Sequence, residues 1–169
     1  LTFVIVVRLR LLQIPLSRDE GEFAYMGQLI LNGIPPYDRA YNMKLPGIYL
    51  AYACILLLGG QTIASIHLGL LVINVVSIVI LIYLGKRLFG PLAGMIAGAS
   101  YAVLSLSPSV QGTAADASHF VVVAAMAGIG VGLKGLDSGK LWHYAASGVF
   151  LGLAFLMKQP GLMFGLFMG

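Results

Sequence analysis

The sequence predicts an all-α fold, a polytopic bundle of about five transmembrane helices with short amphipathic helices in the first extracytoplasmic loop. Composition is the first observation behind this prediction. The 169 residues are 59% hydrophobic and only 9% charged, with a mean hydropathy of +0.95, whereas soluble domains are about 25% charged. The second observation is that the apolar residues stand in long uncharged stretches, which is typical of membrane spans.

The charged residues separate the apolar segments from one another. A transmembrane helix needs roughly 17–25 predominantly apolar residues. On this criterion we predict spans over residues 1–16, 63–84, 91–108, 117–134 and 141–158. Because the sequence begins at Leu and stops in apolar sequence at Gly, we expect residues 1–169 to be the N-terminal part of one longer membrane domain, inactive alone.

Residues 17–62 form the predicted first outer loop. A short helix is expected to begin after Ser17, because apolar residues recur on one helical face until Asn32 and Gly33 end the pattern. A second short helix is expected over 46–58. Both would lie at the membrane interface.

The carboxylates at the start of the first helix permit two interpretations. Ser17 with Glu20, or Asp19 with Glu22, fits the pattern of a capping box, in which the side chains only stabilise the helix start. A carboxylate at the mouth of a span, beside Arg18, is also suited to act as a general base. The second interpretation favours Asp19.

Short basic loops predict the orientation. Lys86 with Arg87, and Lys134 with Lys140, lie in loops that the positive-inside rule places in the cytoplasm. The loop 17–62 and the opposite ends of the spans then lie outside. Six of the ten basic residues would be on that outer side, against the rule, but acids accompany them, so a functional site explains their presence.

Several classes of protein and site are excluded or disfavoured. Cys54 is the only cysteine, which excludes disulfides and thiolate zinc sites within the chain. The net charge of +4 is modest and the basic residues are scattered, so nucleic-acid binding has no support. Asp116 and His119 stand one helical turn apart, but two ligands do not make a metal site. We predict no cofactor and leave a divalent metal open.

Small and polar residues inside the spans are assigned to helix packing. His67 and Asn74 share one face of the span 63–84 and are expected to hydrogen-bond to neighbouring helices. Glycines spaced four apart predict close helix contacts in three spans: Gly94 and Gly98, Gly128 and Gly132, Gly148 and Gly152.

Five segments stand out along the chain: residues 18–25 and 44–49 in the first outer loop, 85–90 at a turn, 113–116 ending in an aspartate, and 152–160 with the pattern G-L-A-F-L-x-K-x-P. In this order they resemble the first extracytoplasmic loop, a cytoplasmic turn, the second-loop aspartate and a later segment of the GT-C membrane glycosyltransferases, which include the protein mannosyltransferases and the aminoarabinose transferases of lipid A.

Two positions depart from the family pattern. Leu45 stands where the family usually has proline, and Ala117 follows the second-loop aspartate where a proline or bulky apolar residue is usual. These departures concern the subfamily more than the class.

The resemblance implies transfer of a sugar from a polyprenyl-phosphate donor to an extracytoplasmic acceptor by a single inverting displacement. The donor phosphate needs cations just outside the hydrocarbon. Lys44 and Lys158 are placed for that role, with Arg18 a weaker candidate. The alternative for both lysines is that they only snorkel from helix ends to the interface.

The same resemblance nominates the catalytic carboxylates. Asp19 is the expected base, Glu20 beside it is the second catalytic candidate, and Asp116 either supports the site or only caps a helix. The expected partners are the polyprenyl-phosphate sugar, membrane lipid, and an unknown glycan, lipid or protein acceptor. The expected location is a bacterial plasma membrane with the active site outside.

A membrane transporter or channel subunit is the rival class. Its ionisable groups would stand near the membrane midplane, whereas those of this chain stand at one end of the spans. A purely structural subunit would leave the charged first loop unexplained. If the transferase interpretation holds, Asp19, Lys44, Asp116 and Lys158 should cluster at one membrane face.

Overall fold

The computed structural model describes residues 2–168, and within them the regular structure is entirely helical, as predicted. In chain order the helices are α1 (Thr2–Arg10), α2 (Arg18–Leu31), α3 (Gly47–Gly59), α4 (Ile63–Phe89), α5 (Pro91–Leu104), the 3₁₀ turn η1 (Pro108–Val110), α6 (Ala117–Ser138), α7 (Leu141–Met157), the 3₁₀ turn η2 (Gln159–Gly161) and α8 (Leu162–Met168).

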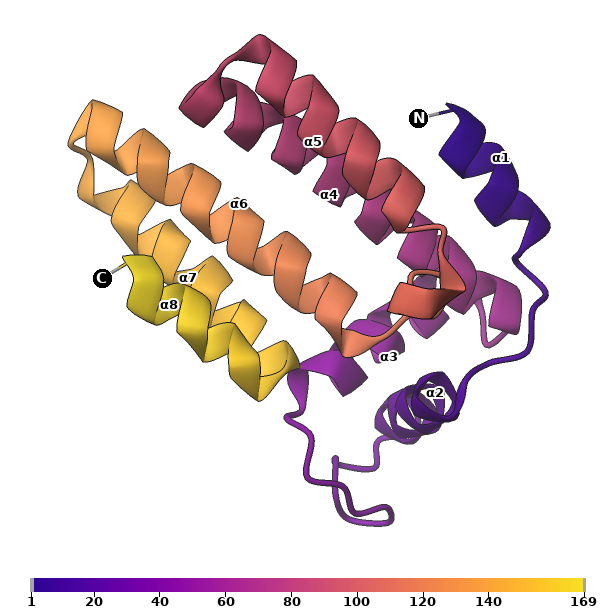
Figure 1. Ribbon diagram of the computed structural model, residues 1–169. Coiled ribbons are helices and arrows are strands. Elements are labelled where there is room, and N and C mark those ends of the chain that lie inside the picture. Colours follow the sequence, from indigo (N-terminus) through magenta and orange to yellow (C-terminus); the bar gives the residue numbers. More distant parts are fainter. Residues whose placement is uncertain (1, 169) are drawn as a thin grey trace.

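The bundle is built from the long helices. Helix α4 packs against both α5 and α6, and α7 packs on the other side of α6 (Figure 1). Helix α1 contacts α4, and α8 contacts α7. Helices α4 and α6 are long and apolar enough to cross a membrane, and α3, α5 and α7 are shorter apolar helices.

The cytoplasmic turn predicted at Lys86 and Arg87 continues the helix instead of ending it. Helix α4 runs on to Phe89 and not only to residue 84. The Arg87 guanidinium donates to the Leu133 carbonyl oxygen at 2.7 Å and lies 2.6 Å from a carboxylate oxygen of Asp137. These contacts join the C-terminal ends of α4 and α6 at one end of the bundle.

Two helices end earlier than the predicted spans. Helix α1 stops at Arg10 and not at residue 16, and α5 stops at Leu104 and not at residue 108. The Arg8 guanidinium donates to the carbonyl oxygens of Ser105, at 2.7 Å, and of Gly112, at 2.9 Å. Because the last carbonyls of a helix lack partners within it, this buried arginine stabilises the early end of α5.

The glycine prediction is correct in two helices and wrong in a third. A Cβ on Gly94 of α5 would lie 2.5 Å from the Ile82 carbonyl oxygen, and one on Gly128 of α6 would press on α7. Both glycines therefore permit close helix contacts. Gly148 and Gly152 of α7 face open space, so close packing within the described residues does not explain them.

Asn74 joins α4 to α5, as expected. Its side chain is fully buried, and the Tyr101 hydroxyl donates to its amide oxygen at 3.3 Å. The amide nitrogen donates to the Leu70 carbonyl oxygen at 2.9 Å. Each polar group of this buried amide thus has a partner.

Helices α2 and α3 pack on each other at one end of the bundle. In Figure 1, α2 is seen nearly along its axis while α4 to α7 run across the picture, so α2 lies crosswise to the long helices. Its predicted apolar face is confirmed, since Phe23 and Met26 are buried. The Phe23 ring meets Tyr52 of α3 edge-on at 5.4 Å.

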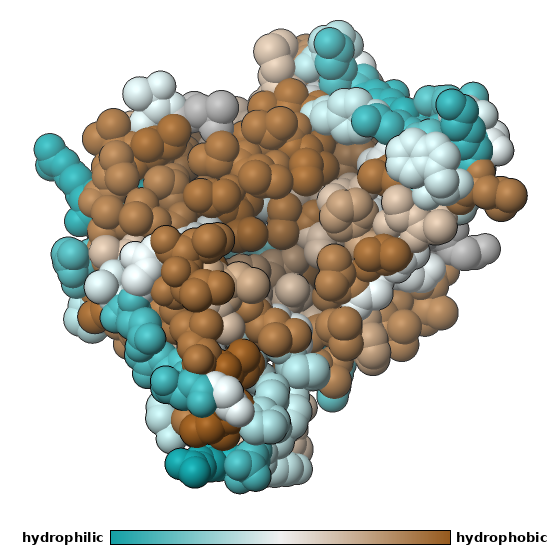
Figure 2. Space-filling model, turned by 180° about the vertical axis from the view of Figure 1, so that it is seen from behind, coloured by the Kyte–Doolittle hydropathy of each residue, from teal (hydrophilic) through white to brown (hydrophobic). Residues whose placement is uncertain are grey.

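The outer surface of the long helices is strongly apolar. Figure 2 shows a broad hydrophobic face with hydrophilic side chains at its borders. Exposed large side chains on the helices include Leu58, Val72, Val79 and Met95. An apolar belt of this extent suits contact with lipid.

Candidate active site

The site begins with the first turn of α2. Ser17 is the N-cap, its hydroxyl accepts from the Glu20 backbone N–H at 3.4 Å, and the Ser17 N–H donates to Glu20 Oε2 at 2.8 Å. Of the two capping boxes that the sequence allowed, the structure forms the one between Ser17 and Glu20. Asp19 is therefore not the cap.

Glu20 faces the interior of the protein. Its side chain is 2% exposed, and Oε1 accepts from the Ala115 N–H at 2.7 Å. Burial raises the pKa of this carboxyl, but the nearby His67 ring and hydrogen bonds from Ala115 and Ser17 outweigh it, so the net pKa is lowered. Both oxygens of Glu20 are thus engaged: Oε2 caps the start of α2, and Oε1 joins α2 to the segment before α6.

Asp19 projects on the other side of the same turn and is about half exposed. Lys44 Nζ lies 3.2 Å from its Oδ2 and 3.5 Å from Glu22 Oε2. The ammonium also sits 4.4 Å from the centre of the Phe23 ring, a distance at which a cation is attracted to the ring face. Glu22, which sequence reasoning treated only as a capping candidate, thus shares the lysine with Asp19.

Glycine at the start of α3 brings Lys44 close to the end of α7. A Cβ on Gly47 would lie 2.5 Å from the Leu156 carbonyl oxygen, so no larger residue fits without moving backbone. Helix α7 ends at Met157, and Lys158 follows. This close approach places the two lysines on the walls of one cavity.

Asp116 is the N-cap of α6 and also an ion-pair partner. Its Oδ1 accepts from the Ser118 N–H at 2.8 Å and lies 3.5 Å from Lys158 Nζ. Burial raises the pKa of the Asp116 carboxyl, but hydrogen bonds from Ser118 and the Lys158 charge outweigh it, so the net pKa is lowered. Lys158 also donates to the Ser118 hydroxyl at 3.0 Å, a contact that the sequence analysis missed.

One cavity of about 300 Å³ is lined by Asp19, Lys44, Asp116 and Lys158, together with mainly apolar neighbours. The expected clustering of these four residues at one end of the bundle is confirmed. Arg18 does not line it. Arg18 borders a neighbouring cavity of about 270 Å³, which Asp19 and Asp116 also line.

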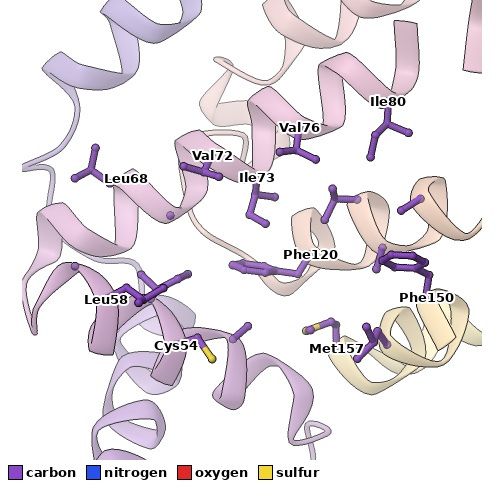
Figure 3. Close-up of a pocket in the computed structure, with 18 of the residues that line it drawn as sticks. Cys54, Leu58, Leu68, Val72, Ile73, Val76, Ile80, Phe120, Phe150 and Met157 are labelled. Atoms are coloured by element: carbon purple, nitrogen blue, oxygen red, sulfur yellow. The ribbon is translucent and has the colours of Figure 1, made fainter. Parts of the chain in front are cut away.

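An apolar groove of about 800 Å³ lies beside the polar cavity, between α3, α4, α6 and α7. Figure 3 shows Val72 and Val76 of α4 facing Phe120 of α6 and Phe150 of α7 across it. Met157 lines both the groove and the polar cavity. The two spaces are therefore neighbours, one charged and one apolar.

No cluster of three His, Cys, Asp or Glu side chains that could hold a metal ion occurs among residues 2–168. The chemistry that this arrangement offers comes from carboxylates and ammonium groups. Together they can bind an anion and accept a proton.

The family model of the dolichyl-phosphate-mannose-protein mannosyltransferases matches residues 43–168, most of the chain. The chain belongs to this family. It is accordingly an integral membrane protein and a membrane glycosyltransferase of the GT-C type, which decides against the transporter or channel alternative. No curated protein and no solved structure matches the chain significantly.

The match to this mannosyltransferase family covers only part of the candidate site. Lys44, Asp116 and Lys158 lie within the matched segment, and Asp19 and Glu20 precede it. The link from Asp19 to the matched residues is therefore geometric, through its ion pair with Lys44 and the shared cavity.

Proposed function

We propose that this mannosyltransferase-family chain transfers a sugar from a polyprenyl-phosphate donor to an extracytoplasmic acceptor by a single inverting displacement. The observation that carries the proposal is the 300 Å³ cavity, whose walls hold two carboxylates and two ammonium groups from four separate segments. Opposite charges placed this way suit a reaction in which an anion leaves and a proton is taken up.

The donor is an amphiphile, and the two neighbouring spaces match its two parts. Lys44 and Lys158 bind the phosphate and stabilise the negative charge that grows on it as the sugar departs. The apolar groove beside Met157 receives the polyprenyl chain nearest the phosphate. An apolar pocket with a few placed charges is the usual form of a small-molecule site.

Asp19 serves as the base. Its carboxylate takes the proton of an acceptor hydroxyl, the hydroxyl oxygen attacks the anomeric carbon, and the bond from that carbon to the phosphate oxygen breaks with its electron pair leaving on the phosphate. Lys44 neutralises Asp19 at 3.2 Å. The donor phosphate competes for this lysine, which leaves the carboxylate free to accept a proton.

The other candidates act on these residues. Asp116 holds Lys158 in place, and Glu20, named as catalytic from the sequence, is assigned to positioning Asp19 because both its oxygens are engaged. Arg18 faces the neighbouring cavity, where it can contact the acceptor. The acceptor class, glycan, lipid or protein, is set by groups beyond these.

The cavity end of the bundle is assigned to the outside of a bacterial plasma membrane. The basic residues Lys86, Arg87, Lys134 and Lys140 gather at the opposite end, where α4 and α6 terminate. Positive charge in short loops favours the cytoplasmic side. A polyprenyl-phosphate sugar and its acceptor would then meet at the outer surface.

The test is a transfer assay with the intact protein in membrane vesicles. Label in the sugar of a polyprenyl-phosphate mannose donor should move from the organic-soluble donor into material of the host membrane. Lys44→Ala and Lys158→Ala should each reduce this transfer, and Lys140→Ala, at the opposite end, should not. If all four proteins move label at the same background rate, or if none consumes the donor or other polyprenyl-phosphate sugars, the proposal fails.

A further inference from the structure

His67 of α4 is a buried imidazole, 5% exposed, that touches the connection between α1 and α2. Its Nδ1 lies 3.0 Å from the Leu12 carbonyl oxygen. A carbonyl oxygen only accepts hydrogen bonds, so Nδ1 must carry the hydrogen. This contact keeps a hydrogen on Nδ1, so Nε2 is the ring nitrogen that can gain or lose a proton.

The second ring nitrogen, Nε2, lies next to Glu20. His67 Nε2 lies 3.4 Å from Glu20 Oε1, where the carboxylate is 2% exposed, and it has no hydrogen-bond partner among residues 2–168. In the neutral ring this nitrogen would turn a lone pair toward a carboxylate. Two acceptors facing each other away from water repel, whereas a proton between them makes a buried charge pair.

Besides Glu20 itself, charged and titratable groups near this pair come from three other elements. Glu20 of α2 is the anion beside the His67 ring, and Arg8 of α1 is a cation near it. Tyr52 of α3 and His119 of α6 also interact electrostatically with Glu20. Of these groups, the Glu20 carboxylate is the one that forms an ion pair with His67.

We propose that His67 is a positioning residue for the transfer reaction, because a proton held between His67 Nε2 and Glu20 Oε1 locks the first turn of α2 to α4 and thereby fixes Asp19 in the cavity. The inference rests on the proposed function. Glu20 Oε1 also accepts from the Ala115 N–H at 2.7 Å. Glu20 follows Asp19 in the chain, and it accepts a hydrogen bond from Ala115, which precedes Asp116. The Glu20 carboxylate is therefore adjacent to both acids of the cavity.

The contact between His67 and Glu20 should weaken as pH rises. When pH rises and the shared proton leaves, Nε2 and Oε1 repel, and the first turn of α2 loosens. Transfer by the wild-type protein should then fall on the alkaline side. Misplacing a catalytic group by about 1 Å can cost about 10²-fold in rate, so even a small displacement of Asp19 is measurable.

The test compares His67→Gln and His67→Leu with the wild type in the intact protein. Glutamine places an amide N–H donor near the position of Nε2 that does not titrate, so His67→Gln should keep transfer and lose the alkaline decline. His67→Leu removes the donor and should lower kcat by about 10- to 100-fold at all pH values. Its KM for polyprenyl-phosphate mannose should change little, because Lys44 and Lys158 remain.

His143→Gln, at the opposite end of the bundle, is the matched control and should keep the wild-type pH profile. An unchanged alkaline decline in His67→Gln, or near-normal kcat in His67→Leu, overturns the inference. If His67→Leu does not fold, the comparison of the wild type with His67→Gln still decides.

A readout without donor separates this inference from the proposed function. Amide hydrogen exchange of the segments holding Ser17 to Phe23 and Ala115, corrected for intrinsic exchange rates, is followed from neutral to alkaline pH. Protection should drop with rising pH in the wild type and stay constant in His67→Gln. Equal pH dependence in both proteins contradicts the lock, whether or not any sugar is transferred.

Discussion

Lys44 Nζ lies 3.2 Å from Asp19 Oδ2, which joins the segment before α3 to the first turn of α2. Each group neutralises the charge of the other. Because one is the proposed phosphate ligand and the other the proposed base, donor binding must break the pair before transfer can begin. Substituting either residue should therefore give a different kinetic signature.

Asp19→Asn should abolish the base and preserve the fold. Ser17, not Asp19, caps α2, so the helix start keeps its hydrogen bonds. General-base catalysis typically contributes about 10²- to 10⁴-fold, and kcat for sugar transfer should fall by about that factor while KM for the donor changes little. Asp38→Asn, an exposed carboxylate in the same loop, is the control. Near-normal transfer by Asp19→Asn would remove Asp19 from the mechanism.

Lys44→Ala should weaken binding as well as turnover. The substitution leaves Asp19 and Glu22 facing the donor phosphate without their shared cation. A charge-assisted contact of this kind is worth about 10- to 100-fold in affinity, so KM for the donor should rise by about that factor. Lys44→Arg should recover part of the loss because it restores the charge. A change in kcat alone would show that Lys44 acts only in the transition state.

Glu20→Gln should destabilise the protein at neutral pH. The Ser17 and Ala115 N–H groups each donate to a different oxygen of Glu20, and an amide can accept from only one of them. A buried unpaired N–H costs about 1–3 kcal/mol. Thermal unfolding of the purified protein in detergent measures the difference. Glu22→Gln, whose side chain is partly exposed, should have a smaller effect.

The stability contributed by Glu20 should also depend on pH. Burial raises the pKa of its carboxyl, but the hydrogen bonds lower the pKa by more than burial raises it. The pKa in the folded protein therefore lies below the pKa in the unfolded chain. The ionised group then stabilises the fold above the unfolded pKa, and this contribution is lost as pH falls through the lowered folded pKa. The gap in unfolding temperature between wild type and Glu20→Gln should close toward acid pH. A constant gap would contradict this assignment.

Gly47→Ala should separate the two cavity lysines. Its Cβ would lie 2.5 Å from the Leu156 carbonyl oxygen, so α3 and the end of α7 must move apart. We expect lower thermal stability together with a loss of transfer, because Lys44 and Lys158 could no longer bind one phosphate. Gly152→Ala, where a Cβ meets nothing within 4 Å, should leave both properties near the wild type. Full activity in Gly47→Ala would mean that this approach is not needed.

The clustering of the four cavity residues followed from the order of the helices along the chain. Because successive spans cross the membrane in opposite directions, the number of spans between them places four residues at the same end: Asp19, Lys44, Asp116 and Lys158. These residues line one cavity. Helix ends were harder to predict where a distant side chain decides them. Helix α5 ends where Arg8 donates to the carbonyl oxygen of the C-cap residue Ser105, 97 residues later in the chain, and no local pattern contains that information.

Composition and local patterns by themselves determined that the protein is helical and built for a membrane, and they located the helix starts at Ile63, Ala117 and Leu141. Only the tertiary structure decided which of two consecutive acids faces the cavity. Successive residues on a helix point about 100° apart, so Asp19 and Glu20 cannot both face one wall. The rotation of α2 about its axis is set by its packing on α3 and by the hydrogen bond from the Ala115 N–H to Glu20. These contacts join segments that are far apart in the chain.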